Sequence, residues 1–83
     1  MFTVAWDTNA ISMLAAIWTA AINQTAVTAA ADAIDRRLAA NPFIHGNPVC
    51  EGLYAIEVSP LRVLFEANTV ARSVIVVSVN WLP

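Results

Sequence analysis

The segment Ser59-Pro60-Leu61-Arg62-Val63-Leu64-Phe65-Glu66 decides how this chain is interpreted, because an arginine stands inside a strand-like apolar run. A second extended run, Ser73-Val74-Ile75-Val76-Val77-Ser78-Val79, follows after a short connection. Burying an unpaired charge is very costly. Arg62 must therefore reach solvent, pair with an acid, or serve a functional site.

Working outward from this strand pair, the pattern predicts the element order β-α-α-β-β-β in a single domain covering residues 1–83. Strands are expected at 2–6, 53–58, 61–67 and 73–81, and helices at 9–22 and 25–40. Residues 42–52 contain two prolines and two glycines and are expected to form a loop. The predicted fold class is α+β, a helix hairpin packed on a small, mainly antiparallel sheet, with the first strand beside a later one.

Side-chain periodicity assigns faces to these elements. In the first helix, spacings of three and four predict one apolar face, formed by Ile11, Leu14, Ala15, Trp18 and Ile22. In the second helix they predict an inner stripe of Val27, Ala31, Ile34 and Leu38. Alternation along the third strand groups Leu61, Val63, Phe65 and Ala67 against Arg62, Leu64 and Glu66.

Alternation in the last strand groups Ile75, Val77, Val79 and Trp81 against Val74, Val76, Ser78 and Asn80. A β-bulge would invert part of this assignment. The sheet face away from the helices is interpreted as a semi-polar, partner-binding surface. Its predicted residues are Arg62, Leu64, Glu66, Ser78, Asn80 and Trp81.

Composition favours a protein that meets a partner. The chain is 59% hydrophobic and 12% charged, whereas an average globular chain is about 25% charged. Part of this apolar excess is expected on a surface that contacts a partner or a second copy. The chain has no lysine, and four arginines face six acids for a net charge of −2. This balance argues against a general nucleic-acid binder, which needs a basic excess.

Other candidate residues favour ordinary structural roles. Cys50 and His45 are the only cysteine and histidine, so no disulfide or zinc cluster is expected within the chain, nor any cofactor or metal. The uncharged stretch 8–31 is long enough to span a membrane, but Asn23-Gln24-Thr25 interrupts it, so no membrane helix is expected. The N-terminus lacks the basic region of a secretory signal, so a reducing cytoplasm is expected.

The element order, the strand arginine and the valine-rich last strand resemble the RelE/ParE superfamily of bacterial type II toxins, also called plasmid-stabilisation proteins. Further matching pieces are Trp6, the alanine-rich hairpin, the segment 34–38 before Asn41-Pro42, Gly46 and Arg72. The resemblance implies a growth-inhibiting toxin neutralised by a cognate antitoxin, whose helix or extended segment covers the sheet. It also implies a ribosome-bound message or DNA gyrase as target. A homodimer is a further alternative.

The resemblance leaves catalysis open. Arg62 matches the strand arginine of the family and Arg72 a hairpin position, so these are the candidate catalytic residues of a ribosome-dependent mRNA endoribonuclease. However, no lysine precedes Arg62, no tyrosine segment follows Trp81 in this sequence, and no clear base stands beside the arginine. A non-enzymatic toxin is therefore favoured, with the endoribonuclease and an inactive antitoxin-binding relative as alternatives. An ion pair of Arg62 with Glu57 or Glu66 is as compatible with the sequence as a role in a site.

Overall fold

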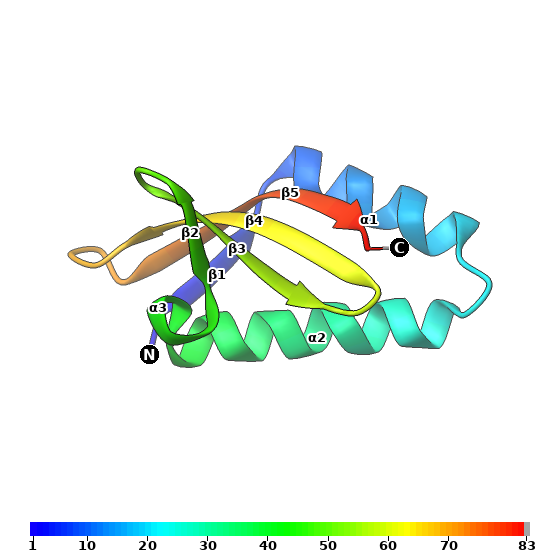
Figure 1. The fold of residues 1–83 in the computed structure, drawn as a ribbon, viewed down its shortest axis with the longest axis horizontal. Helices are drawn as coiled ribbons and strands as arrows, with labels where there is room; N and C mark the ends of the chain where they lie inside the picture. The colour runs from blue at the N-terminus through cyan, green and yellow to red at the C-terminus, as the bar shows by residue number, and fades with distance from the viewer. Residues whose placement is uncertain (83) are drawn as a thin grey trace.

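The computed structural model describes residues 1–82 and shows one five-stranded sheet flanked by two long helices (Figure 1). The strands are β1 (Thr3–Trp6), β2 (Asn47–Cys50), β3 (Leu53–Val58), β4 (Leu61–Asn68) and β5 (Ser73–Trp81). The helices are α1 (Thr8–Ala20), α2 (Gln24–Ala40) and the single-turn α3 (Pro42–His45). The strand order is β1-β5-β4-β3-β2, with β1 parallel to β5 and the other neighbours antiparallel. The predicted α+β class is confirmed, and so is the pairing of the first strand with a later one.

Each long helix begins at a side-chain cap. The Asp7 carboxylate accepts a hydrogen bond from the backbone N–H of Ala10 at 2.8 Å, which starts α1. The Asn23 side chain accepts one from the N–H of Ala26 at 3.0 Å, which starts α2. Both bonds satisfy a backbone donor that has no partner within the helix. Because Asn23 lies only a few residues after the end of α1, the chain reverses there and forms the predicted helix hairpin. No helix within residues 1–82 is both long enough and apolar enough to cross a membrane.

The core lies between the hairpin and one face of the sheet. Helix α2 contributes the fully buried Ile34 and Leu38, and β4 contributes Leu61, Val63 and Phe65. The predicted inner stripe of α2 is confirmed at Val27, Ile34 and Leu38, but Ala31 is only half-buried and Ala30 is buried in its place. The predicted inner face of β4 is confirmed at its three large residues, while Ala67 is half-buried. Figure 1 shows α2 running beneath the sheet while α1 follows the outer side of β5.

The predicted loop over 42–52 is wrong, because this segment contains α3 and the edge strand β2. The Asn41 side chain accepts hydrogen bonds from the N–H groups of Phe43 and Ile44 at 3.0 and 3.3 Å, which closes one helical turn. Pro42 occupies the start of that turn, where a missing N–H is harmless. Pro48 is tolerated in β2 because this strand lies at the edge and pairs only with β3.

A bulge in β5 changes which side chains are buried. Leu64 pairs with Ser78, but the next residue of β4, Phe65, pairs with Val76, so Val77 is an extra residue in β5. The alternation therefore shifts at Val77. Strict alternation assigns the four valines and one isoleucine of β5 to the two faces of the sheet. In the structure, Val74, Val76 and Val79 are buried and Ile75 is exposed. The prediction that grouped Ile75 with Val79 and opposed both to Val74 and Val76 is wrong.

Helix α1 covers the part of β5 that β1 leaves unpaired. Strand β1 pairs with β5 only as far as Val76. Beyond that point the N–H of Asp7 donates to the carbonyl of Val76 at 3.0 Å, and the Asn9 amide donates to the carbonyl of Val77 at 3.5 Å. Unpaired strand edges invite pairing with another chain. The start of α1 therefore supplies hydrogen-bond donors to the backbone carbonyls at this edge of β5, next to the bulge.

Candidate functional site

Arg62 lies on the sheet face away from the buried side chains of β4. Its cross-strand neighbours are Glu57 on β3 and Asn80 on β5. The Nε atom of Arg62 lies 3.2 Å from Oε2 of Glu57, and the two side chains are 40% and 53% exposed. An ion pair this exposed contributes at most about 1 kcal/mol. Arg62 thus both pairs with an acid and reaches solvent, and the partner is Glu57 rather than Glu66.

Polar and apolar side chains alternate around this arginine. Leu64 is half-buried opposite Ser78, whose hydroxyl accepts a hydrogen bond from the Asn80 amide at 3.2 Å. Glu66 is exposed near the far end of β4. Five of the six residues predicted for the partner-binding face therefore share one side of the sheet. We call them the sheet face: Arg62, Leu64, Glu66, Ser78 and Asn80.

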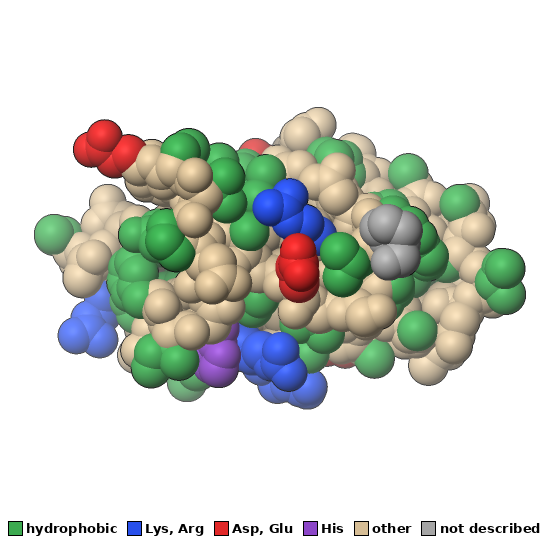
Figure 2. Space-filling model, viewed as in Figure 1, with side chains coloured by type: hydrophobic (Ala, Val, Ile, Leu, Met, Phe, Trp, Pro, Cys, Tyr) green, Lys and Arg blue, Asp and Glu red, His purple; other side chains and the backbone are tan. Residues whose placement is uncertain are grey.

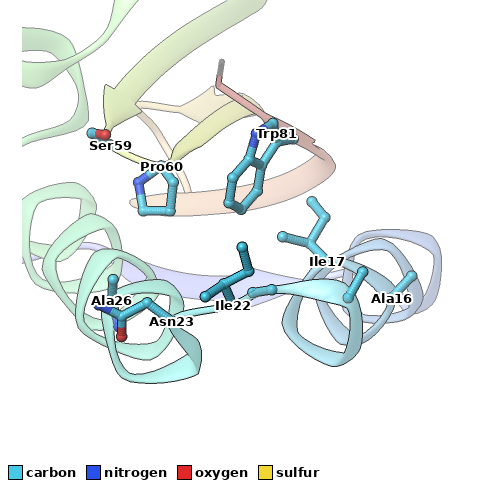
Figure 3. Close-up of a pocket in the computed structure, with 10 residues that line it drawn as sticks. Ala16, Ile17, Ile22, Asn23, Ala26, Ser59, Pro60 and Trp81 are labelled. Carbon is cyan, nitrogen blue, oxygen red and sulfur yellow. The ribbon is translucent and has the colours of Figure 1, made fainter.

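Trp81 does not belong to the sheet face. It pairs with Leu61, whose side chain points into the core, and its own ring turns toward the helices (Figure 3). Trp81 therefore lies on the helix side of the sheet with Val79, as the alternation predicts, and not with the other residues predicted for the partner-binding face. Trp81 is 52% exposed and forms one wall of a cavity of about 670 Å³.

This cavity is apolar. It opens between the end of α1, the start of α2 and the β3–β4 turn, and none of its lining residues is charged. Ile17, Pro60 and Trp81 project into it from three different elements, and Ile22 lies at its rim (Figure 3). It can accept apolar side chains but offers no acid or base for catalysis.

The two candidate catalytic arginines do not lie together. Arg72 sits in the β4–β5 turn with a φ of 52°, beside the pair Asn68 and Ser73. Arg62 lies at the other end of the same hairpin, opposite Asn80. Strand residues rise about 3.3 Å each, so the six steps from Arg62 to Asn68 separate the two ends by about 20 Å. On the face shown in Figure 2, the basic side chains likewise do not gather into one patch.

His45 and Cys50 form no recognisable chemical site. His45 ends α3 and Cys50 ends β2, and both are exposed. Within residues 1–82, no three side chains of the His, Cys, Asp or Glu type lie close enough to hold a metal ion.

Sequence reasoning missed a surface on the helix hairpin. The apolar face predicted for α1 is not directed wholly into the core: Ala10 is buried, whereas Ile11 and Trp18 are 55% and 44% exposed. These two side chains line hollows between α1 and α2 together with Asp32. The signal was present in the spacing of Ile11, Leu14 and Trp18, but spacing alone does not distinguish a buried face from a groove.

Comparison with known proteins supports the fold. No protein-family model and no curated protein sequence matches the chain. A chain of the RelBE2 toxin–antitoxin complex from Mycobacterium tuberculosis superposes with a TM-score of 0.80, at 18% identity, covering 96% of this chain and 90% of that one. A chain of the chromosomal ParDE toxin–antitoxin system from P. aeruginosa gives a TM-score of 0.66 at 14% identity, covering 100% and 98%.

At identities this low, a structural likeness establishes the fold and no more. Both neighbours match this chain along nearly its whole length. The chain therefore shares its fold with a chain from each of these two structures, in agreement with the resemblance noted from its element order and the strand around Arg62.

Proposed function

We propose that this chain is the toxin component of a bacterial type II toxin–antitoxin system, inhibiting growth in the cytoplasm until a cognate antitoxin binds it. The observation that carries the proposal is the superposition on a chain of the RelBE2 toxin–antitoxin complex over 96% of this chain, with a TM-score of 0.80. The ParDE neighbour supports it independently, since that structure is also of a toxin–antitoxin system.

The distribution of charge favours action by binding over RNA cleavage. Cleavage through a 2′-hydroxyl needs a base, an acid and cations gathered around one phosphate. Here Arg62 is held by Glu57 at 3.2 Å, and Arg72 lies at the opposite end of the hairpin. The sheet face instead offers Leu64 among polar side chains, a mixture suited to an extended or helical segment of an antitoxin.

The proposal is tested by inducing the wild-type chain in a bacterial host and following growth. We expect arrest, and we expect recovery when the product of the adjacent reading frame is expressed with it. Arg62→Ala should weaken the complex with that product, whereas Arg36→Ala, which removes the same charge from an exposed position on α2, should not. Circular dichroism of both variants confirms that they fold.

Message integrity then separates binding from cleavage. An intact transcript pool during arrest supports the binding toxin. Cleaved messages would replace this proposal with the ribosome-dependent endoribonuclease. Normal growth at confirmed soluble expression would refute the active toxin, and antitoxin binding without arrest would identify an inactive relative.

A further inference from the structure

The apolar cavity beside Trp81 has the size of a small-molecule pocket. Its volume is about 670 Å³, and pockets that hold drug-sized molecules span about 300–1,000 Å³. Two turns of a helix, about 11 Å long and about 10 Å wide, would occupy about 850 Å³. The cavity is therefore too small to enclose a segment of that kind, whereas a compact molecule fits inside it.

Two walls of different character face each other across the apolar cavity. On the sheet side, the rings of Pro60 and Trp81 project toward the helix hairpin (Figure 3). On the hairpin side, Ile17 and Ile22 point back toward these rings, and the rest of that wall consists mainly of alanines (Figure 3). Aromatic rings prefer offset stacking on flat partners. A space between rings and short aliphatic side chains therefore suits a flat molecule.

Ile22 is held at the mouth of the apolar cavity by hydrogen bonds of its neighbours. Its side chain is fully exposed, and that of Trp81 is 52% exposed. Before Ile22, the N–H of Ala21 donates to the carbonyl of Trp18 at 3.3 Å, and after it the Asn23 side chain caps α2. A bound apolar ligand would remove Ile22 and Trp81 from water, and removal of apolar surface from water favours binding.

The described residues that line the apolar cavity carry no charge, and two of them, Asn23 and Ser59, have polar side chains. A charged group that entered this space would lose hydration without gaining an opposite charge. The cavity therefore suits an uncharged ligand. The carbonyl oxygen of the Asn23 side chain accepts from the N–H of Ala26, which uses the oxygen and not the N–H groups of the amide. These N–H groups and the Ser59 hydroxyl can orient a ligand, as the few polar groups of small-molecule pockets do.

We propose that the apolar cavity binds a flat, uncharged, aromatic small molecule. The ligand lies between the rings of Pro60 and Trp81 and the aliphatic side chains of the hairpin, and it covers Ile22. This site is separate from Arg62, which lies on the opposite face of the sheet beside Glu57. The inference goes beyond the proposed function, because it requires neither toxicity nor a partner on the sheet face.

The test uses two fluorescent probes that share one ring system and differ in charge. The first, N-phenylnaphthylamine, is uncharged, and the second, anilinonaphthalene sulfonate, carries one sulfonate on the same rings. Both probes fluoresce more strongly in an apolar site than in water, so titration with the folded full chain measures each dissociation constant. We expect saturable binding of the uncharged probe. Binding of the sulfonate should be at least about tenfold weaker, because its charge has no partner in the lining.

Matched variants locate the uncharged probe. Trp81→Ala removes one wall and should weaken binding about tenfold, whereas Trp18→Ala truncates a similarly exposed tryptophan outside the cavity and should leave binding unchanged. Ala16→Phe fills the cavity from an exposed position on α1 and should weaken binding about tenfold or more. Ala15→Phe adds the same ring at the adjacent exposed position, which lines a different hollow, and should have no effect. Circular dichroism checks folding, and if Trp81→Ala does not fold, the Ala16→Phe and Ala15→Phe pair decides.

Four results would overturn the inference. The first is absence of saturable binding of the uncharged probe to the folded chain. The second is equal or tighter binding of the sulfonate. The third is binding that survives Trp81→Ala and Ala16→Phe but is lost in Trp18→Ala or Ala15→Phe, which would place the probe on the outer side of the hairpin. The fourth is self-association of the chain, measured by light scattering, that Trp81→Ala abolishes and the probe does not reverse, which would assign the cavity to a second copy.

Discussion

Replacing Gly46 by alanine should strongly destabilise the fold, although Gly46 lies outside any long element. Its backbone has a φ of −94°, which alanine adopts without strain. The added methyl group, however, would lie 2.4 Å from Cζ of Phe65 and 2.7 Å from the carbonyl oxygen of Pro42. Carbon atoms in favourable contact are about 3.5–4.0 Å apart. The side chain or the backbone must therefore move by more than an ångström.

Neither neighbour can move easily. Phe65 is fully buried and stacks on Tyr54 with ring centroids 5.6 Å apart. The carbonyl of Pro42 is fixed because it accepts the hydrogen bond from the N–H of Gly46 at 2.9 Å, which closes α3. Overpacking a well-filled core costs about 1–3 kcal/mol, and a constrained site belongs at the upper end. A domain of this length has a total stability of about 4–12 kcal/mol.

Thermal and urea unfolding, followed by circular dichroism, measure the effect. A loss of about 3 kcal/mol lowers the Tm by about 12–24 °C in a domain of this size. Gly52→Ala is the matched control, because its φ of +79° adds backbone strain while nothing lies within 4 Å of the new methyl group. That strain costs about 1–2 kcal/mol. Phe65→Leu removes the clashing ring atom, so combining it with Gly46→Ala should cost less than the sum of the two single changes.

The reasoning fails if the free energy of unfolding of Gly46→Ala lies within about 1 kcal/mol of the wild-type value, because overpacking at a fixed contact costs at least that much. It also fails if Gly52→Ala is the more damaging change. Either result would mean that α3 can move away from Phe65 at little cost. Additive costs in the double variant would mean that the methyl group and the ring do not meet.

Three further predictions concern the free energy of unfolding after substitutions in other parts of the fold. Removing the exposed ion pair by Arg62→Ala, Glu57→Gln or both should reveal a coupling below about 1 kcal/mol in a double-mutant cycle measured by urea unfolding, and a larger value would mean that the pair is desolvated. Asp7→Ala should cost about 1 kcal/mol, because it removes the cap on α1; an unchanged midpoint of thermal unfolding would contradict that role. Leu38→Ala should cost about 2–5 kcal/mol by emptying a fully buried position on α2, and a cost below 1 kcal/mol in urea would show that α2 is not anchored there.

The sequence predicts the elements of the fold well where residue periodicity is uninterrupted. Along β4, alternation placed Arg62 and Leu64 on one face and Phe65 on the other, as the structure has them. In β5 the same reasoning fails at Val77, because one extra residue reverses every side chain before it relative to those after it. A run of valines carries no mark of the bulge, since every position in it is apolar.

The segment between the hairpin and β3 was misinterpreted for a different reason. Its prolines and glycines are typical of loops, but each also has a place in regular structure. Pro42 opens α3 and Pro48 lies in an edge strand. Gly46 permits the close approach of α3 to Phe65, a contact between residues far apart in the sequence. Tertiary packing, which local propensity does not contain, decides the conformation here.

The candidate site shows the same limit more sharply. Arg62 and Arg72 are ten positions apart in the sequence, and the resemblance to the RelE/ParE superfamily made each a candidate catalytic residue. In the β4–β5 hairpin, Arg72 lies in the turn and Arg62 lies near the open end. The two residues are therefore far apart in space although they are close in sequence. Conversely, Ile11 and Asp32 are distant in sequence but line one groove, because α1 and α2 reverse at Asn23. The exposed apolar side chains of the hairpin are thus brought together by the helix reversal, which the strand pattern does not indicate.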